Sequence, residues 1–224
     1  MRRFMVLLIV ALVSSAPVRT QSATTPSAES VARALQAKYD RVRDFSTDFV
    51  HAYRGGVLHQ TATERGRLSV KKPGKMRWEY TSPERKLFVS DGRKLYSYIP
   101  EDKQVIVSDV PNEDHATTPA LFLAGKGNLQ RDFTVSYVQI DSVPAGTTVL
   151  KFSPRRAEPE YDWLALAVDP RTLAIRALVT VDSQGGRSTF TFTNLKENVR
   201  IADNEFAFSI PRGVDVITDL VNGQ

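Results

Sequence analysis

The chain has 224 residues, of which 42% are hydrophobic, enough for one large globular domain or two small ones. It contains no cysteine, which excludes a fold held by disulfides and acylation on a cysteine of its own. The formal net charge of +5 comes from basic residues interspersed with acidic ones, without a recognisable nucleic-acid-binding module. A nucleic-acid-binding protein is therefore excluded.

The first residues have the order of a secretory signal peptide. Arg2 and Arg3 precede an uncharged run from Phe4 to Val13, and small residues follow. The run is about half of the roughly 20 residues that a membrane-spanning helix needs, so cleavage is favoured over a retained anchor. We expect residues 1–23 to be a signal peptide and flexible leader with an uncertain cleavage site, and residues 24–224 to form one exported domain.

A single amphipathic helix is predicted next. Thr25 or Ser27 is a candidate N-cap, and Glu29 lies in the first turn. Apolar residues then recur at steps of three and four, which places them on one face of a helix that must lie on the rest of the protein. They are Val31, Leu35, Tyr39, Val42 and Phe45.

From Phe45 onward the apolar period changes to two, which is typical of strands. The connections between the predicted strands are short and rich in Pro, Gly and Asp, so about ten or eleven strands form an antiparallel meander. One segment interrupts it, with Thr118 as N-cap, Pro119 at the first helical position and a short helix to Ala124. The alternation that predicts these strands occurs in the segments 49–53, 68–70, 76–80, 87–89, 95–99, 105–107, 133–137, 148–152, 163–168, 175–181, 189–193 and 206–210.

The apolar face of this sheet is larger than two helices can cover. We expect one strongly curved sheet with a hollow under the helices, while a two-sheet sandwich with a filled core is the alternative. The residues assigned to this apolar face include Met76, Trp78, Leu87, Val89, Tyr96 and Tyr98.

The hairpin "VKKPGKMRWEY" at residues 70–80 allows a sharper prediction. A two-residue Pro-Gly loop would mix polar and apolar side chains on each face of the sheet. A three-residue loop, Lys72 to Gly74, pairs Val70 with Met76 and Leu68 with Trp78, and gives one clean apolar face. We therefore expect these four residues to line the hollow, with Lys72 at its rim.

No constellation for catalysis or metal binding is evident. His51, His59 and His115 lie far apart in the sequence and are expected at the surface or in loops. No G-x-S-x-G elbow occurs. We expect a protein that is not an enzyme, with no catalytic residue, no metal and no cofactor.

Three segments resemble the LolA family of periplasmic lipoprotein carriers. The first is "GRLSVKKPGKMRWEYTSPERKLFVSDGRKLYSYIPEDKQVIV", from Gly66 to Val107. The second is "TPALFLAGKGNLQRDF", similar to the family's middle helix, and the third is "NLKENVRIADNEFAFSIPRGVDVI", similar to its C-terminal end. The resemblance covers nearly the whole of the predicted exported domain.

The resemblance implies a mainly β (α+β) fold, a single unclosed and strongly curved antiparallel β-barrel with helices over its mouth as a lid. It implies a soluble periplasmic carrier, expected to be a monomer, that binds the acyl chains of lipoproteins. The implied partners are acylated lipoproteins as cargo, an inner-membrane ABC-type release complex and an outer-membrane lipoprotein acceptor. The residues expected to line the lipid-binding cavity are those of the predicted apolar face, namely Leu68, Val70, Met76, Trp78, Leu87, Val89, Tyr96 and Tyr98.

The resemblance also assigns two further roles. Leu121, Phe122 and Leu123 are expected to form the lid and to fill the cavity when it is empty. Lys72 occupies a position where the family commonly has Arg, which acts in lid closure and transfer. Lysine lacks the planar fork of donors that arginine has, so its latching contacts are expected to be weaker, and Arg77 is a candidate to compensate.

Two other functions are open alternatives. A periplasmic sensor or regulatory domain of the same open-barrel shape would bind lipid or lipoprotein as a signal. Such proteins usually carry a second domain, for which this chain has little room after its last predicted strand. An enzyme acting on a lipid or cell-wall substrate lacks a candidate nucleophile or base.

Overall fold

The computed structural model describes residues 25–57, 60–110, 127–159 and 161–218. Within them the chain is mostly β, as predicted, and its strands form one sheet. The elements in chain order are α1 (Ala28–Arg41), β1 (Asp44–Arg54), β2 (Thr61–Lys71), β3 (Lys75–Ser82), β4 (Lys86–Asp91), β5 (Lys94–Ile99), β6 (Gln104–Asp109), α3 (Leu129–Asp132), β7 (Phe133–Tyr137), β8 (Thr148–Pro154), β9 (Trp163–Val168), β10 (Ile175–Val181), β11 (Arg187–Glu197), the 3₁₀ helix η2 (Asp203–Phe206) and β12 (Asp215–Thr218).

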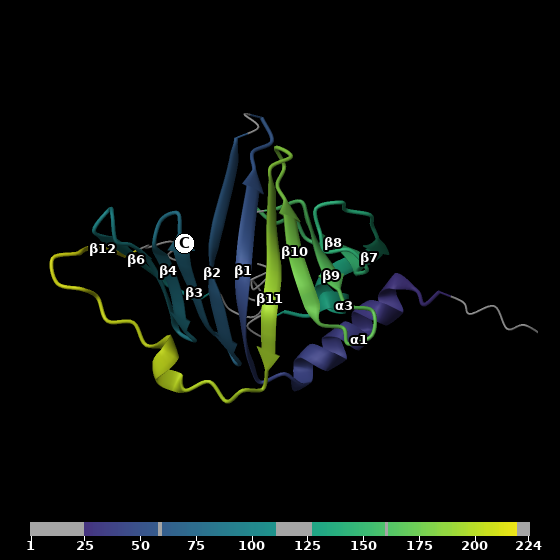
Figure 1. The fold of residues 1–224 in the computed structure, drawn as a ribbon, viewed down its shortest axis with the longest axis horizontal. Coiled ribbons are helices and arrows are strands. Elements are labelled where there is room, and N and C mark those ends of the chain that lie inside the picture. Colours follow the sequence, from purple (N-terminus) through teal and green to yellow (C-terminus); the bar gives the residue numbers. More distant parts are fainter. Residues whose placement is uncertain (1–24, 58–59, 111–126, 160, 219–224) are drawn as a thin grey trace, which may run out of the picture.

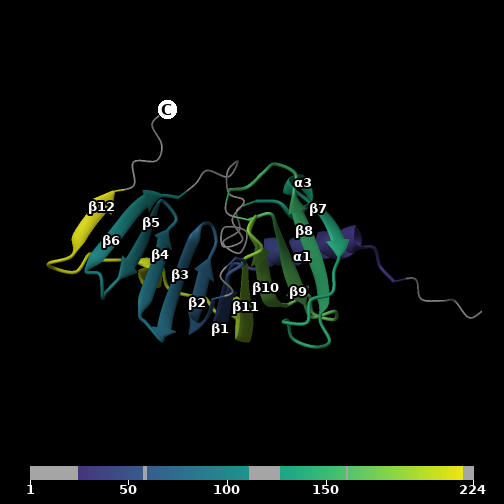
Figure 2. The same ribbon diagram turned by 90° about the horizontal axis from the view of Figure 1, so that it is seen from above.

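The sheet curves into an open arch and does not close. Its order is β12-β6-β5-β4-β3-β2-β1-β11-β10-β9-β8-β7, so β12 and β7 are its two ends among the described strands. They lie on opposite sides of the arch in both views (Figures 1 and 2). The open curved sheet is therefore confirmed, and the two-sheet sandwich is wrong.

The path of the chain differs from the expected single meander. Strands β1 to β6 lead outward from the centre in one direction, while β7 to β11 begin at the other edge and return to pair with β1. The last strand, β12, pairs with β6 in parallel rather than antiparallel orientation. Two meanders thus meet at the β1–β11 pair, which joins residues far apart in the sequence.

Helix α1 forms where the sequence predicted an amphipathic helix. The Ser27 hydroxyl accepts a hydrogen bond from the Ser30 amide at 3.2 Å, which caps the first turn, and Lys38 and Arg41 lie in the last turn. The buried residues are Ala28, Ala32, Leu35 and Tyr39. Val42 caps the helix and Phe45 already belongs to β1, so only part of the predicted stripe lies on the helix.

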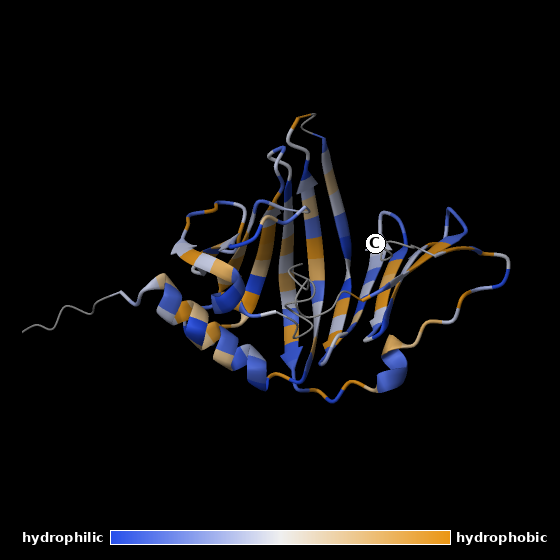
Figure 3. Ribbon diagram, turned by 180° about the vertical axis from the view of Figure 1, so that it is seen from behind, coloured by the Kyte–Doolittle hydropathy of each residue, from blue (hydrophilic) through white to orange (hydrophobic). Residues whose placement is uncertain are grey.

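The sheet has apolar side chains on both faces. The concave face is the one on which α1 packs, and it carries the main core, which includes Phe49, Leu68, Trp78 and Leu166. Figure 3, seen from this side, shows hydrophobic bands along the central strands. A smaller cluster, with Ala165, Ala177 and Val179 at its centre, lies on the convex face, where Val138, Ile140 and Val143 pack against it.

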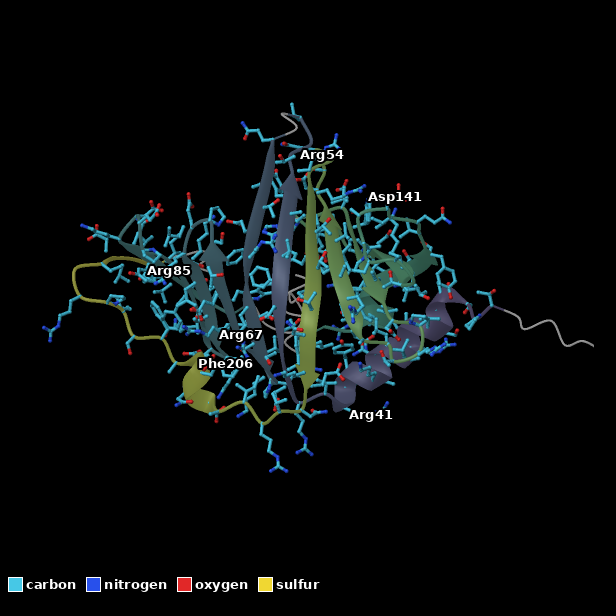
Figure 4. All side chains as sticks on the ribbon, in the orientation of Figure 1. Arg41, Arg54, Arg67, Arg85, Asp141 and Phe206 are labelled. Atoms are coloured by element: carbon cyan, nitrogen blue, oxygen red, sulfur yellow. The ribbon has the colours of Figure 1, made fainter. Side chains whose placement is uncertain are left out.

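The segment after β11 crosses the convex face. A strand was predicted at residues 206–210, and this is wrong, because a 3₁₀ helix ends at Phe206 and irregular backbone follows. Phe206, labelled in Figure 4, is buried, and η2 contacts β3 and β4. The Phe208 ring packs against Tyr96 at 5.2 Å and Tyr98 at 5.8 Å between ring centroids.

Gly66 on β2 allows close packing at the centre of the sheet, which leads to a prediction. A Cβ at this position would lie 2.2 Å from the Glu79 carbonyl oxygen and 2.6 Å from Cζ of Phe49. We expect Gly66→Ala to lower the free energy of unfolding by about 1–3 kcal/mol, as overpacking of a core does. Gly55→Ala is the control, because its nearest neighbour would be at 3.6 Å. Urea unfolding measures both, and equal effects would contradict this packing account.

Candidate functional site

The hairpin between β2 and β3 has the predicted register. Lys71 pairs with Lys75, so Lys72, Pro73 and Gly74 form a three-residue loop, and Gly74 adopts a φ of 73° that favours glycine. Leu68 pairs with Trp78, Val70 pairs with Met76, and all four side chains are buried. The shared apolar face of these four residues is confirmed, while their contact with a ligand stays a prediction.

The other four predicted cavity residues lie on the convex face, which corrects the prediction of one shared face. Val89 pairs with Arg77, the residue between Met76 and Trp78, so its side chain points to the opposite side. Tyr96 pairs with Val89 and Tyr98 pairs with Leu87, which places these residues on the same convex side. The C-terminal segment covers this side through Phe208.

An aromatic cluster forms the floor of the concave face at the centre of the sheet. The Phe49 ring lies 5.3 Å from Trp78, 4.9 Å from Tyr80 and 6.0 Å from Phe190, all in edge-on arrangements. Tyr80 extends the cluster to Phe88 on β4 at 5.8 Å. Edge-on aromatic pairs of this kind stabilise a core beyond their burial alone, so we expect this floor to be rigid.

Among the described residues, the concave face is less covered toward β4, β5, β6 and β12. Phe88 and Leu95 are half-buried, and further along the sheet Ile106 is 40% exposed and Ile217 is 44% exposed. The register places Phe88 beside Trp78, and Ile106 beside Ser97 and Ile217. We call Phe88, Leu95, Ile106 and Ile217 the apolar wall, a surface suited to an apolar ligand rather than to water.

Lys72 binds the end of α1. Its ammonium group donates a hydrogen bond to the backbone oxygen of Tyr39 in the last helical turn. Burial lowers the pKa of Lys72 below its ordinary value, an effect that the nearby Asp40 carboxylate opposes. A cation at the C-terminus of a helix interacts favourably with the helix dipole. Arg77 does not share this role, because it lies on the convex face beside Glu79.

Further contacts hold α1 over the β7–β11 end of the sheet. The buried Tyr39 hydroxyl accepts a hydrogen bond from the Ile175 amide at 3.1 Å, and Lys38 pairs with Glu197 at 2.7 Å. The Gln36 side chain accepts a hydrogen bond from the Leu129 amide at 2.9 Å, which joins α1 to α3. The helix is thus fixed along its length and covers one side of the concave face.

A polar cluster lies on the concave face at one end of the aromatic floor. We define it as His51, Glu64, Lys86 and Ser188. The His51 ring contacts the Glu64 carboxylate through Nδ1 and the Ser188 hydroxyl through Nε2, each at 3.1 Å. Lys86 donates to the other Glu64 oxygen at 2.7 Å. The ring also stacks on Phe190 at 4.1 Å between centroids. The expectation of a surface or loop histidine is therefore wrong for His51.

The polar cluster is partly desolvated, which shifts its pKa values. Burial lowers the pKa of His51 below its ordinary value, and the hydrogen bond and charge of Glu64 oppose this. Burial acts to raise the pKa of Glu64, but hydrogen bonds from Lys86 and His51 lower it by more. The hydrogen bond to Glu64 raises the pKa of Lys86. Near neutral pH we therefore expect a neutral imidazole beside a carboxylate and an ammonium group.

A separate hollow of about 330 Å³ lies between α1, α3 and β7. Phe133 and Val135 contribute apolar surface, but Glu29, Arg33 and Arg155 also line it. Charged side chains make it a poor site for an acyl chain, because contact with hydrocarbon would remove water from them. We therefore place the candidate site on the apolar wall and the aromatic floor.

Some of the predicted residues lie outside the described ranges. They are the predicted signal peptide and leader, the lid residues Leu121, Phe122 and Leu123, and the histidines at 59 and 115. In the part of the chain that the structure describes, no group of three or more His, Asp or Glu side chains is arranged to hold a metal ion. No helix within the same ranges has the length and apolar character to cross a membrane.

Comparisons with known proteins point to one family. The family model described as outer membrane lipoprotein carrier protein LolA matches residues 40–209. A protein of Chromohalobacter salexigens named outer-membrane lipoprotein carrier protein is 31% identical over 221 residues, 98% of this chain and 99% of that protein. A protein of the same name from Nitrosomonas europaea is 26% identical and covers 87% of this chain and 92% of its own length.

The fold also resembles a solved structure. The crystal structure of an uncharacterized conserved protein from Thermus thermophilus superposes with a TM-score of 0.54. The alignment covers 85% of this chain and 99% of that chain at 11% sequence identity. At this identity the likeness concerns the fold alone.

The contact of Lys72 with α1 can be tested by Lys72→Met, which keeps the apolar stem and removes the charge. We expect a loss of about 1–2 kcal/mol in the free energy of unfolding, because the Tyr39 carbonyl loses a charged donor. Amide hydrogen exchange in the last turn of α1 should also accelerate. Lys94→Met is the control, since Lys94 pairs with Asp109 at the exposed surface. Unchanged exchange in α1 would contradict the anchoring role.

The pKa of His51 predicts a dependence of stability on pH. Because the folded-state pKa lies below the ordinary 6.5, the unfolded chain binds more protons as the pH falls below about 6.5, and stability is lost there. Glu64, with its lowered pKa, should add a further loss only at more acidic pH. We expect His51→Phe to reduce the difference in urea midpoint between about pH 7.5 and about pH 5.5. An unchanged difference would show that other groups cause the acid sensitivity.

Proposed function

The chain belongs to the LolA family of outer membrane lipoprotein carrier proteins, and from this we propose that it carries lipoproteins by binding their acyl chains on the concave face of its sheet. The observation that best supports this site is the apolar wall, whose Ile106 and Ile217 are 40% and 44% exposed inside a curved sheet. An acyl chain laid against this wall would remove apolar surface from water on both partners.

The remaining parts of the proposal rest on the family. We propose a soluble periplasmic protein, exported by the signal peptide, that acts as a monomer without enzymatic activity and without a cofactor. It would receive acylated lipoproteins from an inner-membrane ABC-type release complex and pass them to an outer-membrane lipoprotein acceptor. The names of the relatives support the carrier role, and the sequence pattern of the first residues supports export.

A carrier has to release what it binds, which limits how strongly the site can hold its ligand. Each methylene buried from water contributes about 0.8 kcal/mol, so several fully buried acyl chains would be bound too tightly to leave. Within the described ranges α1 and α3 cover only part of the concave face, and incomplete cover lowers this affinity. A lid that exchanges its own apolar contacts for those of the ligand would lower it further, and Leu121, Phe122 and Leu123 stay the predicted lid residues.

The proposed contact residues are revised by the observed register. Leu68, Val70, Met76 and Trp78 are buried in or beside the aromatic floor. The apolar wall of Phe88, Leu95, Ile106 and Ile217 forms the accessible surface next to them. The side chains of β4 and β5 that point to the convex face are left out, because the C-terminal segment lies over them. The site therefore extends from the aromatic floor toward β12.

Neighbouring residues on β4 provide a matched test of this site. Phe88 faces the concave side and Leu87 the convex side, and both are half-buried. We expect Phe88→Asp to reduce the affinity for a fluorescent acyl probe by tenfold or more, because a carboxylate would be desolvated by the chain. Leu87→Asp should leave the affinity within about threefold. Circular dichroism checks that both variants are folded. Equal losses in the two variants would place the site elsewhere.

The sensor alternative is tested with the intact chain. The protein is expressed with an inner-membrane release complex, purified from the periplasm and examined by mass spectrometry for triacylated protein. The carrier proposal predicts stoichiometric cargo, which leaves when outer-membrane acceptor is added. Free lipid without lipoprotein cargo, and no transfer to the acceptor, would favour the sensor.

A further inference from the structure

The polar cluster contains the one cation that the described strands β1 to β6 place on the concave face. The cross-strand pairs place Lys71, Lys75, Arg65, Arg67 and Arg77 on the convex side, whereas Lys86 pairs with Tyr80 and shares the concave side with Trp78. Its side chain is 26% exposed, and those of Glu64 and His51 are about half as exposed, at 15% and 14%. Lys86 is therefore held in place but accessible to a ligand on this face.

The hydrogen bonds in the polar cluster leave donors only on Lys86. The carboxylate of Glu64 accepts hydrogen bonds, so the neutral His51 ring donates to it through Nδ1 and accepts from the Ser188 hydroxyl through Nε2. The ammonium of Lys86 has three N–H donors, and one of them binds Glu64 at 2.7 Å. A second donor faces the Glu84 carboxylate at 3.7 Å, and the third suits a ligand that offers an acceptor oxygen.

The charges around Lys86 favour a neutral acceptor over an anion. Glu64 lies at 2.7 Å and Glu84 at 3.7 Å from the ammonium, so two carboxylates surround one positive charge. A phosphate or a free carboxylate would be repelled by this pair. The carbonyl oxygen of an ester accepts a hydrogen bond from the ammonium and carries no net charge.

The place of the polar cluster fits the end of an acyl chain. His51 and Phe45 lie on the same face of β1, six residues apart, which corresponds to roughly 20 Å of strand. The part of the concave face between these two rows is apolar and includes the buried Phe49, Leu68 and Trp78. Beyond the cluster Tyr53 is 40% exposed, so the apolar floor ends here.

We propose that Lys86, held by Glu64 and His51, binds the ester carbonyl oxygens that join the acyl chains of the ligand to glycerol, while the chains lie on the aromatic floor and the apolar wall. This rests on the proposed function and adds which part of the ligand is recognised and by which group. The site therefore selects diacylglyceryl-type ligands over other apolar molecules of the same chain length.

Two synthetic lipopeptides test this directly. One carries a diacylglyceryl group on its N-terminal cysteine, and the other carries the dialkyl ether analogue, which has equal chains but no carbonyl oxygens. We expect the protein to bind the ester about tenfold more tightly than the ether, in competition with a fluorescent acyl probe. Lys86→Met should remove this preference and leave binding of the ether unchanged. Lys94→Met, at an exposed ion pair on the convex face, should keep the preference.

A second variant keeps the test conclusive if the Lys86→Met protein does not fold. Should Lys86→Met leave Glu64 unpaired and unfold the chain, the double variant Glu64→Gln with Lys86→Met removes both charges together. Equal affinity of the wild-type protein for ester and ether, or a preference that survives in the folded Lys86 variant, would overturn the carbonyl site and leave the carrier proposal intact. Failure of the wild-type protein to bind either lipopeptide would overturn both.

Discussion

The structure depends on one constraint, which is that a single curved sheet has apolar side chains on both faces, and the helices of the described ranges cover only part of them. On the convex side the segment after β11 and the loop after β7 supply the cover, through Phe206, Phe208 and Ile140. On the concave side α1 covers the β7–β11 end and α3 packs beside it. The unequal cover leaves the wall near β4, β5, β6 and β12 accessible, and this wall is the basis of the proposed function.

Charged groups mark the two limits of the concave floor. At one end Lys72 binds the last turn of α1 and fixes how far the helix extends over the sheet. At the other end Glu64 and Lys86 form an ion pair beside His51. Burying such groups against an apolar surface is costly unless they are paired, so their positions are well defined by their partners. The apolar surface between them is correspondingly well bounded.

Local patterns predicted the features that depend on neighbouring residues. The helix at Ala28–Arg41 and the loop at Lys72–Gly74 follow from capping, periodicity and the register of one hairpin. The direction in which the β4 side chains point could not be predicted in this way. Leu87, Phe88 and Val89 are consecutive apolar residues, so the sequence does not show which of them face the concave side. The pairing of β4 with β3 sets that direction, and the segment after β11, more than 100 residues later in the sequence, contacts β4 through η2. His51 and Glu64 likewise meet Ser188 and Lys86 only through the pairing of five strands, β4-β3-β2-β1-β11.

The central claim, that acyl chains lie on the concave face between α1 and β12, is tested most directly by site-specific photo-cross-linking. Leu95 and Tyr96 are neighbours on β5 that face opposite sides of the sheet. A photoreactive amino acid is placed at each position in turn, and the protein is irradiated with an acylated lipoprotein bound. We expect cross-links to the acyl chains from position 95 and none from position 96. Cross-links from position 96 alone would contradict it.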